Sequence, residues 1–221
     1  MESVLIIGSG QAGIALASEI RKLDPRRPIT LLGRDTHSFN RTEFVQALGP
    51  QQTPLTIKPL TELAERLRIE VVSGHTVQSI KPIDGSVVTD QGDFQADKLV
   101  LATGASPMLP TFSRELPGLV AAVTHAAVIN KLRARLASIN DLIIIGAGQS
   151  GCELANTLAD AGKNVTVVEQ HAGPLFELMP LDARRHLVEQ LEERGVKFQF
   201  NARCASASKE GHRARLALTN G

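Results

Sequence analysis

Two glycine-rich segments hold the residues of this sequence that are best suited to bind a ligand. They read GSGQAG over residues 8–13 and GAGQSG over residues 146–151. In a GxGxxG turn the first glycine permits the tight bend, the second lets a pyrophosphate approach the backbone, and the third lets a helix pack closely on a strand. The helix that follows offers free N–H groups and a positive dipole end to phosphates. One such turn is a weak signal, but two in the same context indicate two dinucleotide sites.

An acidic residue follows the second glycine motif at the distance expected for a ribose contact. Residues 164–169 read NVTVVE, and Glu169 lies 18 residues after Gly151. A carboxylate at this spacing holds the 2′-hydroxyl of the adenosine ribose. Gln170 and His171 come next, so no adjacent arginine is available for a 2′-phosphate. The pattern favours NAD over NADP.

The first motif differs at the corresponding position. Gly33 follows the apolar run of residues 29–32, where the acid is expected, and the nearest carboxylate is that of Asp35. Asp35 is either a displaced ribose contact or a turn cap, and the sequence leaves both readings open.

An internal repeat supplies the elements that position these residues. Each glycine motif follows a run of four apolar residues, VLII at 4–7 and LIII at 142–145, and 138 residues separate the two copies. Such a run is too short for a helix and typical of a buried parallel strand. Helical patterns follow at 14–22 and 152–161, so each copy predicts a strand, a turn and a helix.

The pattern changes between the motifs and predicts two domains. We expect a short helix at 59–67, a strand at 69–72, antiparallel pieces at 76–83, 86–89 and 93–95, a return strand at 98–102, and a helix at 124–137. Prolines at 107, 110 and 117 mark a crossing between domains. The predicted fold class is α/β with two Rossmann-like dinucleotide-binding domains, one over residues 1–110 and one over residues 111–221.

Composition excludes several other classes of protein. The 221 residues carry a net charge of +1, which gives no reason to expect a nucleic acid or an anionic membrane as partner. The opening residues lack a basic segment, and their apolar run is too short for a secretory signal or a membrane span, so we expect a cytoplasmic protein. Cys152 and Cys204 form no CxxC pair, and the six histidines lack metal-ligand spacing, so no metal is expected.

These residues together resemble the pyridine nucleotide-disulfide oxidoreductases, a family of two-dinucleotide flavoproteins with a glutathione-reductase-like fold, and within it the rubredoxin and flavorubredoxin reductases. The resemblance rests on the first glycine motif, on DKLVLATGA at 97–105 and on IGAGQSGCELA at 145–155. In the family the first unit binds FAD and the second binds NAD(P)H. The disulfide-reducing branch carries an early cysteine pair, but this chain has no cysteine before Cys152.

The resemblance therefore implies an enzyme that passes electrons from NADH through FAD to a small rubredoxin-like iron protein. Two alternatives stay open: a ferredoxin- or nitrite-reductase-type flavoprotein component, and a non-catalytic nucleotide-binding module. The oligomeric state is not predicted.

The family's cofactor contacts carry over to matching positions of this sequence. The expected FAD contacts are Gly8, Ser9, Gly10, Ala12, Gly13, Asp35, Arg41, Val77, Ala102, Thr103 and Gly104; the expected NAD contacts are Gly146, Gly148, Ser150, Gly151, Glu153 and Glu169. The resemblance further implies that Arg41 and Glu153 face one another at the flavin as the catalytic pair. The alternative is that Arg41 is a loop charge in water and that Glu153 is a favourable acid in the first turn of a helix. Arg41 lies in SFNRTEF at 38–44, where Thr42 replaces the family's usual proline and Phe44 its leucine.

Family members normally continue beyond this point with a Gly-Asp motif for the flavin and an interface domain. In the second domain we expect strands at 142–145, 165–169 and 196–200 but no counterpart of the strand at 99–102. The chain ends on Asn220-Gly221, a hairpin-turn signal without a returning strand. We therefore expect the front part of a longer reductase, with an incomplete second domain and weak or no retention of FAD.

Overall fold

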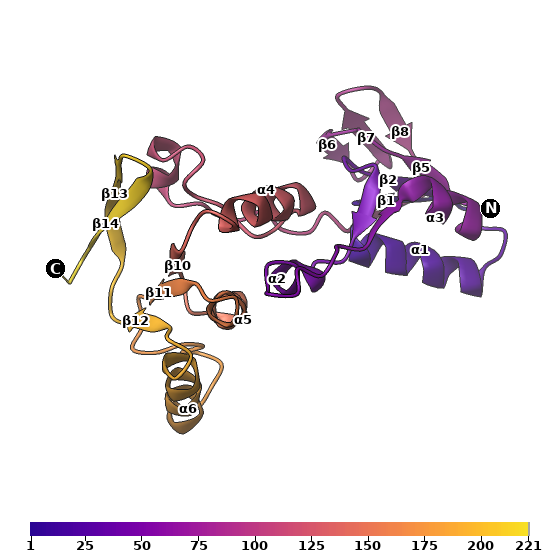
Figure 1. The fold of residues 1–221 in the computed structure, drawn as a ribbon. Helices are drawn as coiled ribbons and strands as arrows, with labels where there is room; N and C mark the ends of the chain where they lie inside the picture. Colours follow the sequence, from indigo (N-terminus) through magenta and orange to yellow (C-terminus); the bar gives the residue numbers. More distant parts are fainter. Residues whose placement is uncertain (221) are drawn as a thin grey trace. The chain divides into compact units, whose positions relative to one another are not determined.

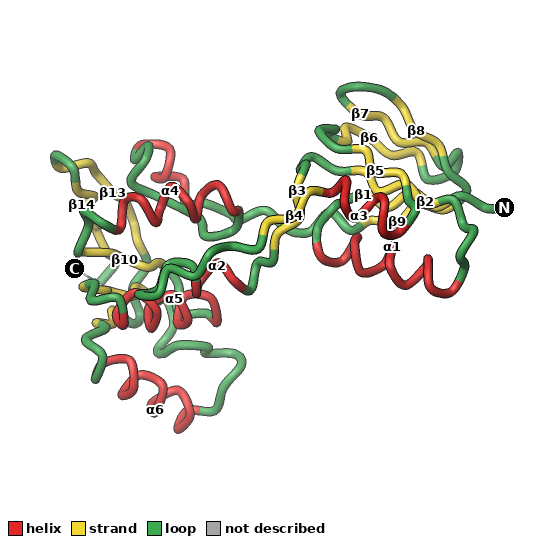
Figure 2. Tube along the Cα trace, turned by 45° about the vertical axis from the view of Figure 1, so that its right-hand side comes forward, coloured by secondary structure: helices red, strands yellow, loops and turns green. Residues whose placement is uncertain are grey.

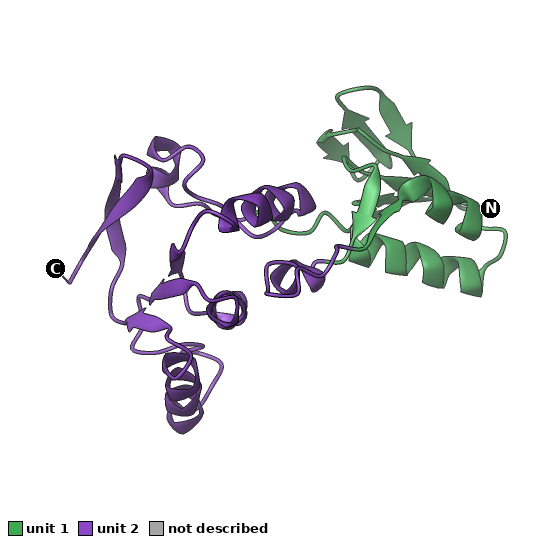
Figure 3. Cartoon of the chain, viewed as in Figure 1, with its two compact units in different colours: residues 1–40, 56–106 green, residues 41–55, 107–221 purple. Residues whose placement is uncertain are grey.

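The computed structural model describes residues 1–220, and these form two compact units (Figures 1 and 3). The first unit comprises Met1–Asn40 and Thr56–Ser106, and the second comprises Arg41–Leu55 and Pro107–Gly221. The segment Arg41–Leu55, which the sequence analysis assigned to the first domain, groups with the second unit. The domain boundary expected at residue 110 stays a prediction. No helix within residues 1–220 is both long and apolar enough to cross a membrane.

A parallel sheet forms the centre of the first unit. Its strand order is β5-β2-β1-β9, with β1 at Val4–Ile7, β2 at Ile29–Leu32, β5 at Glu70–Val72 and β9 at Lys98–Leu101. All four residues of β1 are buried, because the strand has a partner on each side and layers on both faces. This burial explains why the sequence of β1 is a continuous apolar run rather than an alternating one.

Two different layers cover the faces of this sheet (Figure 1). On one face, helices α1 (Gln11–Leu23) and α3 (Leu60–Leu67) pack on a core cluster that includes Ile6, Leu31 and Leu60. On the other face, Leu5 and Val87 belong to a second cluster, which joins the sheet to the antiparallel layer of β6 (Val77–Lys81), β7 (Ser86–Thr89) and β8 (Asp93–Gln95). The antiparallel pieces expected from the sequence are confirmed.

Smaller elements of both units were not predicted from the sequence. In the first unit, β3 (His37–Phe39) and β4 (Ile57–Pro59) pair antiparallel and lie side by side in Figure 2. In the second unit, the short helix α2 (Glu43–Gln46) packs against α5 (Gln149–Asp160). Arg133, on α4 (Ala126–Leu136), donates from Nη2 to the carbonyl of Gln52 at 2.9 Å, which ties the segment 41–55 to the second unit.

The second unit repeats the centre of the first with one strand fewer. Its parallel sheet has the order β10-β11-β12, with β10 at Asp141–Ile145, β11 at Asn164–Val168 and β12 at Lys197–Gln199. Ile145 pairs with Val168 as Ile7 pairs with Leu32. No strand among residues 1–220 flanks the outer side of β10. Ile143 and Ile145 are therefore 46% and 47% exposed, whereas the equivalent residues of β1 are buried. The expected missing strand is confirmed for the described residues.

The C-terminal segment corrects one expectation from the sequence. Strands β13 (Cys204–Glu210) and β14 (Arg213–Leu218) form an antiparallel hairpin, whose turn contains Gly211 with a φ of 62°. The sequence analysis assigned no strands here and placed the turn signal at Asn220-Gly221, so that assignment was wrong for residues 204–218. β14 is itself the returning strand, and the 3-10 helix Thr111–Glu115 supplies Phe112 to the core beneath the hairpin. Gly221 lies outside the described residues.

Candidate nucleotide-binding sites

The three glycines of the first loop have three different environments. Gly8 has a φ of +119°, and a Cβ there would overlap the carbonyl oxygen of Ala102. A Cβ on Gly13 would overlap the carbonyl oxygen of Gly8, so this position must be glycine for helix α1 to pack against the loop. A Cβ on Gly10 would meet nothing within 4 Å. The chain itself requires the first and third glycines, and the second leaves space for a ligand.

The second loop has the same division of roles. Gly146 has a φ of +101°, and a Cβ on Gly151 would overlap the carbonyl oxygen of Gly146. Gly148, like Gly10, has open space where a Cβ would stand. Gly146 differs from Gly8 in having no atom near its Cβ position, because no described strand takes the place that β9 has beside β1. The backbone of this loop can therefore also approach a phosphate closely.

At the N-terminus of the helix that follows each loop, no side chain neutralises the positive end of the helix dipole. Gly10 caps α1 and Gly148 caps α5, and neither helix has a side-chain cap hydrogen bond or an acidic residue in its first turn. The first N–H groups of a helix need partners, and a bound phosphate supplies them with favourable charge. Both loops therefore fit the pyrophosphate of a dinucleotide. The helices begin three residues earlier than the sequence predicted, because the glycine turn runs directly into the helix.

Glu169 is held in place by the second loop. Its side chain is buried, and Oε2 accepts the backbone N–H of Ala147 at 2.7 Å. Oε1 accepts the backbone N–H of His171 at 2.9 Å. Two N–H donors compensate a buried carboxylate well, and each oxygen keeps a lone pair for a further donor such as a ribose hydroxyl. The acid predicted from the spacing therefore lies beside the glycine loop, and its ribose contact stays a prediction.

The first unit cannot place an acid at the same position. The last residue of β1, Ile7, pairs with Leu32, and the last residue of β10, Ile145, pairs with Val168. Gly33 follows Leu32 and Glu169 follows Val168, so the two residues occupy equivalent positions. A Cβ on Gly33 would overlap Ser9 Oγ and lie 2.9 Å from Ser9 Cβ. Ser9 is buried, so its side chain has no room to move away. Asp35 lies half-buried two residues further on, and its ribose contact stays a prediction.

An arginine that sequence spacing did not reveal packs on an aromatic side chain of the segment that follows β11. The ring of His171 stacks on Phe176, with centroids 5.1 Å apart and planes inclined by 12°. The guanidinium carbon of Arg184, on helix α6 (Leu181–Glu192), lies 4.5 Å from the centroid of the same Phe176 ring. The sequence analysis considered only residues adjacent to Glu169 and so missed Arg184.

The predicted catalytic pair shares one cavity. Arg41, at the start of the segment that packs on α5, and Glu153, on α5 itself, are both exposed and both line an open cavity of about 1840 Å³ within the second unit. Glu153 Oε1 accepts a hydrogen bond from Gln149 Nε2 at 3.1 Å. No ion pair between Arg41 and Glu153 is present among the described residues. Their facing arrangement stays a prediction.

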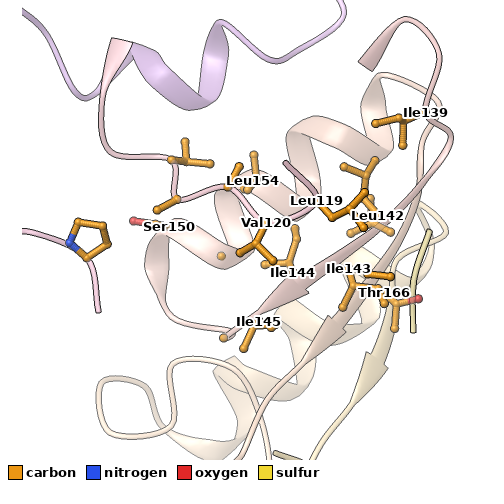
Figure 4. A pocket seen from close by; sticks show the side chains of 18 of the residues that line it. Leu119, Val120, Ile139, Leu142, Ile143, Ile144, Ile145, Ser150, Leu154 and Thr166 are labelled. Atoms are coloured by element: carbon orange, nitrogen blue, oxygen red, sulfur yellow. The ribbon is translucent and has the colours of Figure 1, made fainter. Parts of the chain in front are cut away.

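That cavity combines a nucleotide loop with an open strand edge (Figure 4). It is larger than the few hundred to about 1,000 Å³ of most ligand sites. Much of its lining is apolar, including Leu119, Val120 and the exposed Ile143 and Ile145 of β10. Coenzyme binding at its glycine-rich rim, at Gly146, Gly148, Ser150 and Gly151, stays a prediction.

The remaining predicted contacts lie at the ends of the central strands or in the core. Thr103 and Gly104 are exposed just after β9, and Gly104 has a φ of +68°. Ala102 donates its backbone N–H to the carbonyl of Ile7 at 2.8 Å. Ala12 is exposed in the first turn of α1, whereas Val77 packs against the cluster of Leu5, Ile7, Leu32 and Val87. None of these contacts with a cofactor is tested by the structure.

Cys152 is a packing residue of the second loop. Its thiol is buried, and Sγ donates to the carbonyl of Ala147 at 3.4 Å. Burial, followed by the negative charges of Glu169 and Glu153, raises the pKa of the Cys152 thiol to about 11. At neutral pH the thiol stays protonated, so it is a poor nucleophile.

Comparison with known proteins agrees with this architecture. The sequence profile of the family described as "Pyridine nucleotide-disulphide oxidoreductase" matches residues 2–221. The chain belongs to the pyridine nucleotide-disulphide oxidoreductase family. The resemblance on which the sequence analysis relied is thereby confirmed, and so is the α/β fold class.

Two curated proteins are similar to almost the whole of this chain. The nitric oxide reductase FlRd-NAD(+) reductase of Aeromonas hydrophila is 33% identical over 228 residues, covering 99% of this chain and 57% of its own. The rubredoxin-NAD(+) reductase of Acinetobacter baylyi is 30% identical, covering 100% of this chain and 59% of its own. The chain thus spans less than two thirds of the curated relatives it matches.

A solved structure shares the fold of this chain. The water-forming NADH oxidase of Lactobacillus brevis, bound to NADH, superposes with a TM-score of 0.92 at 20% identity. The match covers 100% of this chain and 51% of the oxidase. At this identity the likeness establishes the fold alone.

Proposed function

We propose that this chain provides the nucleotide-binding part of a FAD-dependent NADH reductase, which passes electrons from NADH through FAD to a small rubredoxin-like iron protein. The observation that carries the proposal is the pair of glycine loops. In each loop the second glycine, Gly10 or Gly148, has open space beside it and precedes a helix that has no side-chain cap hydrogen bond. The names of the two curated relatives support the acceptor class. The cofactors, when bound, supply the redox chemistry, and the chain binds and orients them.

The first unit is the proposed FAD site and the second the proposed NADH site. Glu169 beside the second loop supports NADH there, because a carboxylate accepts from a ribose hydroxyl and repels a 2′-phosphate. The first unit lacks this acid, since Ser9 closes the place of Gly33. The adenosine end of FAD would therefore be held there by the loop and by Asp35.

At the reacting ends of the cofactors we propose Arg41 and Glu153. The guanidinium of Arg41 stays protonated at all relevant pH and would stabilise the negative charge that develops on the flavin after hydride arrives. Glu153 would orient Arg41 and lie beside the nicotinamide. Their shared cavity supports this assignment.

The test is the colour and the reduction of the purified protein. The chain of 221 residues and a version extended to the length of its relatives are purified in parallel, and their visible absorption is recorded before and after NADH. We expect weak or no flavin on the shorter chain, and a yellow extended protein that NADH bleaches and a rubredoxin reoxidises. Dialysis-resistant, stoichiometric FAD on the shorter chain would show that it already encodes the whole flavin site. An extended protein that stays colourless and only binds NADH would favour a non-catalytic module.

A ferredoxin is the alternative acceptor to a rubredoxin. Reoxidation rates with rubredoxin and with a [2Fe–2S] ferredoxin at equal concentration separate the two acceptor classes. We further propose a cytoplasmic location. The free cysteines Cys152 and Cys204 support a reducing compartment.

A further inference from the structure

Four arginines of the first unit line a cavity that is separate from the glycine loop of that unit. The cavity measures about 300 Å³, and its charged lining residues are Arg21, Arg26, Arg27, Arg68 and Glu70. Ile29 and Glu70, the first residues of β2 and β5, line it as well, so it lies at the amino-terminal ends of these strands. The glycine loop follows the carboxyl-terminal end of β1, which runs parallel to β2. We propose that this cavity binds a small oligophosphate anion, of which inorganic pyrophosphate is the simplest example.

A structural role accounts for part of the guanidinium of Arg21. Nε donates to the carbonyl of Leu67 at 2.7 Å, Nη2 to that of Arg68 at 2.8 Å and Nη1 to that of Asp24 at 3.2 Å. These carbonyls lie at the C-terminal ends of α3 and α1, where they have no partner within the helix and carry partial negative charge. Three of the five N–H groups of Arg21 are thereby used, and two are left for another acceptor.

The charge of Arg27 is compensated by two carboxylates. Its Nε donates to Asp24 Oδ2 at 3.0 Å, and its Nη1 lies 3.6 Å from Glu2 Oε2. Asp24 Oδ1 accepts the backbone N–H of Arg26 at 3.0 Å. The N–H of Arg26, followed by the side chain of Arg27, holds the pKa of Asp24 below its ordinary value, so this carboxylate stays charged. Asp24 therefore joins Arg26 and Arg27 to Arg21 in one hydrogen-bonded cluster.

The fold does not compensate the charges of Arg26 and Arg68. Both residues are exposed, and neither side chain forms an ion pair or a hydrogen bond within the described residues 1–220. Glu70 is the carboxylate of the cavity wall, and its Oε2 accepts the hydroxyl of Thr30 at 2.8 Å. Like charges that gather around one cavity repel each other, and a bound anion removes this repulsion. The wall thus carries more positive charge than the structural roles of its arginines require.

The size and lining of the cavity indicate the class of ligand. Its volume lies at the lower end of the range for ligand sites. No aromatic side chain of the described residues lines it, so it offers no stacking surface for a nucleobase. Guanidinium groups bind phosphate oxygens through paired N–H donors, and an anion with two phosphate groups can engage more than one guanidinium. These features favour a small oligophosphate over a nucleotide.

The experiment titrates inorganic pyrophosphate into the 221-residue chain by calorimetry at constant ionic strength, in the presence of saturating 5′-ADP. The 5′-ADP occupies the glycine loops, which are the other proposed phosphate sites of the chain. Arg68→Gln should weaken pyrophosphate binding by about tenfold, as expected for the loss of a hydrogen bond between charged groups. Arg66→Gln is the matched control, because Arg66 is exposed on the same helix end but does not line the cavity. Its pyrophosphate affinity should stay within about twofold of the unmodified chain.

Two further variants keep the test decisive. Arg26→Gln should weaken pyrophosphate binding as Arg68→Gln does, and it replaces that variant if Arg68→Gln fails to fold. Glu70→Gln keeps an oxygen acceptor for Thr30 and removes a negative charge from the wall, so it should strengthen binding by about threefold. Equal pyrophosphate affinities of the Arg68 and Arg66 variants, or unchanged affinity in Glu70→Gln, would overturn the inference.

The same titrations without 5′-ADP separate this inference from the proposed function. A difference between the Arg68 and Arg66 variants in these titrations supports the oligophosphate site even if 5′-ADP does not bind the chain. Failure of 5′-ADP to bind would contradict only the proposed nucleotide sites. Binding of 5′-ADP that is equal in all variants, together with pyrophosphate binding that is also equal in all of them, would leave the nucleotide sites standing and overturn the oligophosphate site.

Discussion

The carboxylate of Glu169 accepts a hydrogen bond of 2.7 Å from the backbone N–H of Ala147, the residue between the first two glycines of the second loop. This hydrogen bond fixes the side chain of Glu169 to the backbone of the glycine-rich turn. A change at Glu169 alters the charge at the ribose and also leaves a backbone donor without its partner.

Replacing Glu169 by alanine should relax the preference for NADH over NADPH by about 1–3 kcal/mol, which is typical for the loss of a charged hydrogen-bond partner. The repulsion of the 2′-phosphate disappears, and so does one acceptor for the ribose hydroxyl. Dissociation constants for both coenzymes, measured by fluorescence titration of the variant and the unmodified chain, check the prediction. Equal constants for NADH and NADPH in the unmodified chain would contradict the assignment of Glu169.

Alanine at two glycines of the same loop should separate binding from folding. Gly148→Ala adds a methyl group to open space, so the protein should fold normally but bind NADH more weakly, because the methyl occupies the path of the pyrophosphate. Gly151→Ala overlaps the carbonyl of Gly146 and should destabilise the fold by roughly 1–3 kcal/mol. Urea unfolding and NADH titration of both variants provide the measurement. Equal stability of the two variants would show that α5 does not depend on this close approach.

The raised pKa of Cys152 predicts slow alkylation and a specific pH dependence. With a pKa of about 11, roughly one thiol in a thousand is ionised at pH 8, so iodoacetamide should modify Cys152 far more slowly than an unfolded control. The pKa of the thiol in the folded state lies above its ordinary value of 9.0, so the folded state retains its proton more strongly. The stability contributed by the protonated thiol is complete below pH 9 and is lost as the pH rises from about 9 to about 11.

Cys152→Ala should remove that part of the alkaline loss of stability, which thermal unfolding between pH 8 and pH 11 would reveal. Cys204→Ala is the control, because Cys204 is only half-buried whereas Cys152 is buried. Rapid labelling of Cys152 in the folded chain at pH 8 would contradict its buried, protonated state.

In the protein extended to full length, Arg41→Ala should slow the reduction of the flavin by NADH and make the flavin potential more negative. The reason is the loss of a permanent positive charge that favours the electron-rich reduced state. Stopped-flow absorption and a redox titration measure both effects, with Arg66→Ala, an exposed arginine of the first unit, as control. An unchanged rate and potential would leave Arg41 as a solvated loop charge.

The parts of the fold that the sequence predicted well are those in which burial determines the residue type. β1 and β2 were assigned to the residue, because each is an apolar run enclosed on both faces. The glycine loops were assigned by spacing alone, since the backbone tolerates no other residue at Gly8 or Gly13.

The elements that were missed bury little apolar surface of their own. Helix α6 has one buried residue, Leu191, and the strand β13 has only Ala207, so neither shows a clear hydrophobic period. The position of Arg184 over Phe176 depends on how the loop after β11 folds back, and no local spacing encodes that. Such sites require the tertiary structure.

The contact between Ser9 and Gly33 restricts the order in which mutations could convert one loop type into the other. Ser9→Ala, which gives the residue that the second unit has as Ala147, removes the overlap of a Cβ at position 33 with Ser9 Oγ but keeps the 2.9 Å approach to the Cβ of residue 9. Gly33→Glu should therefore cost less stability after Ser9→Ala than before it, and in both cases the backbone of the loop has to shift. The effects of the two substitutions on stability should depend on one another rather than add.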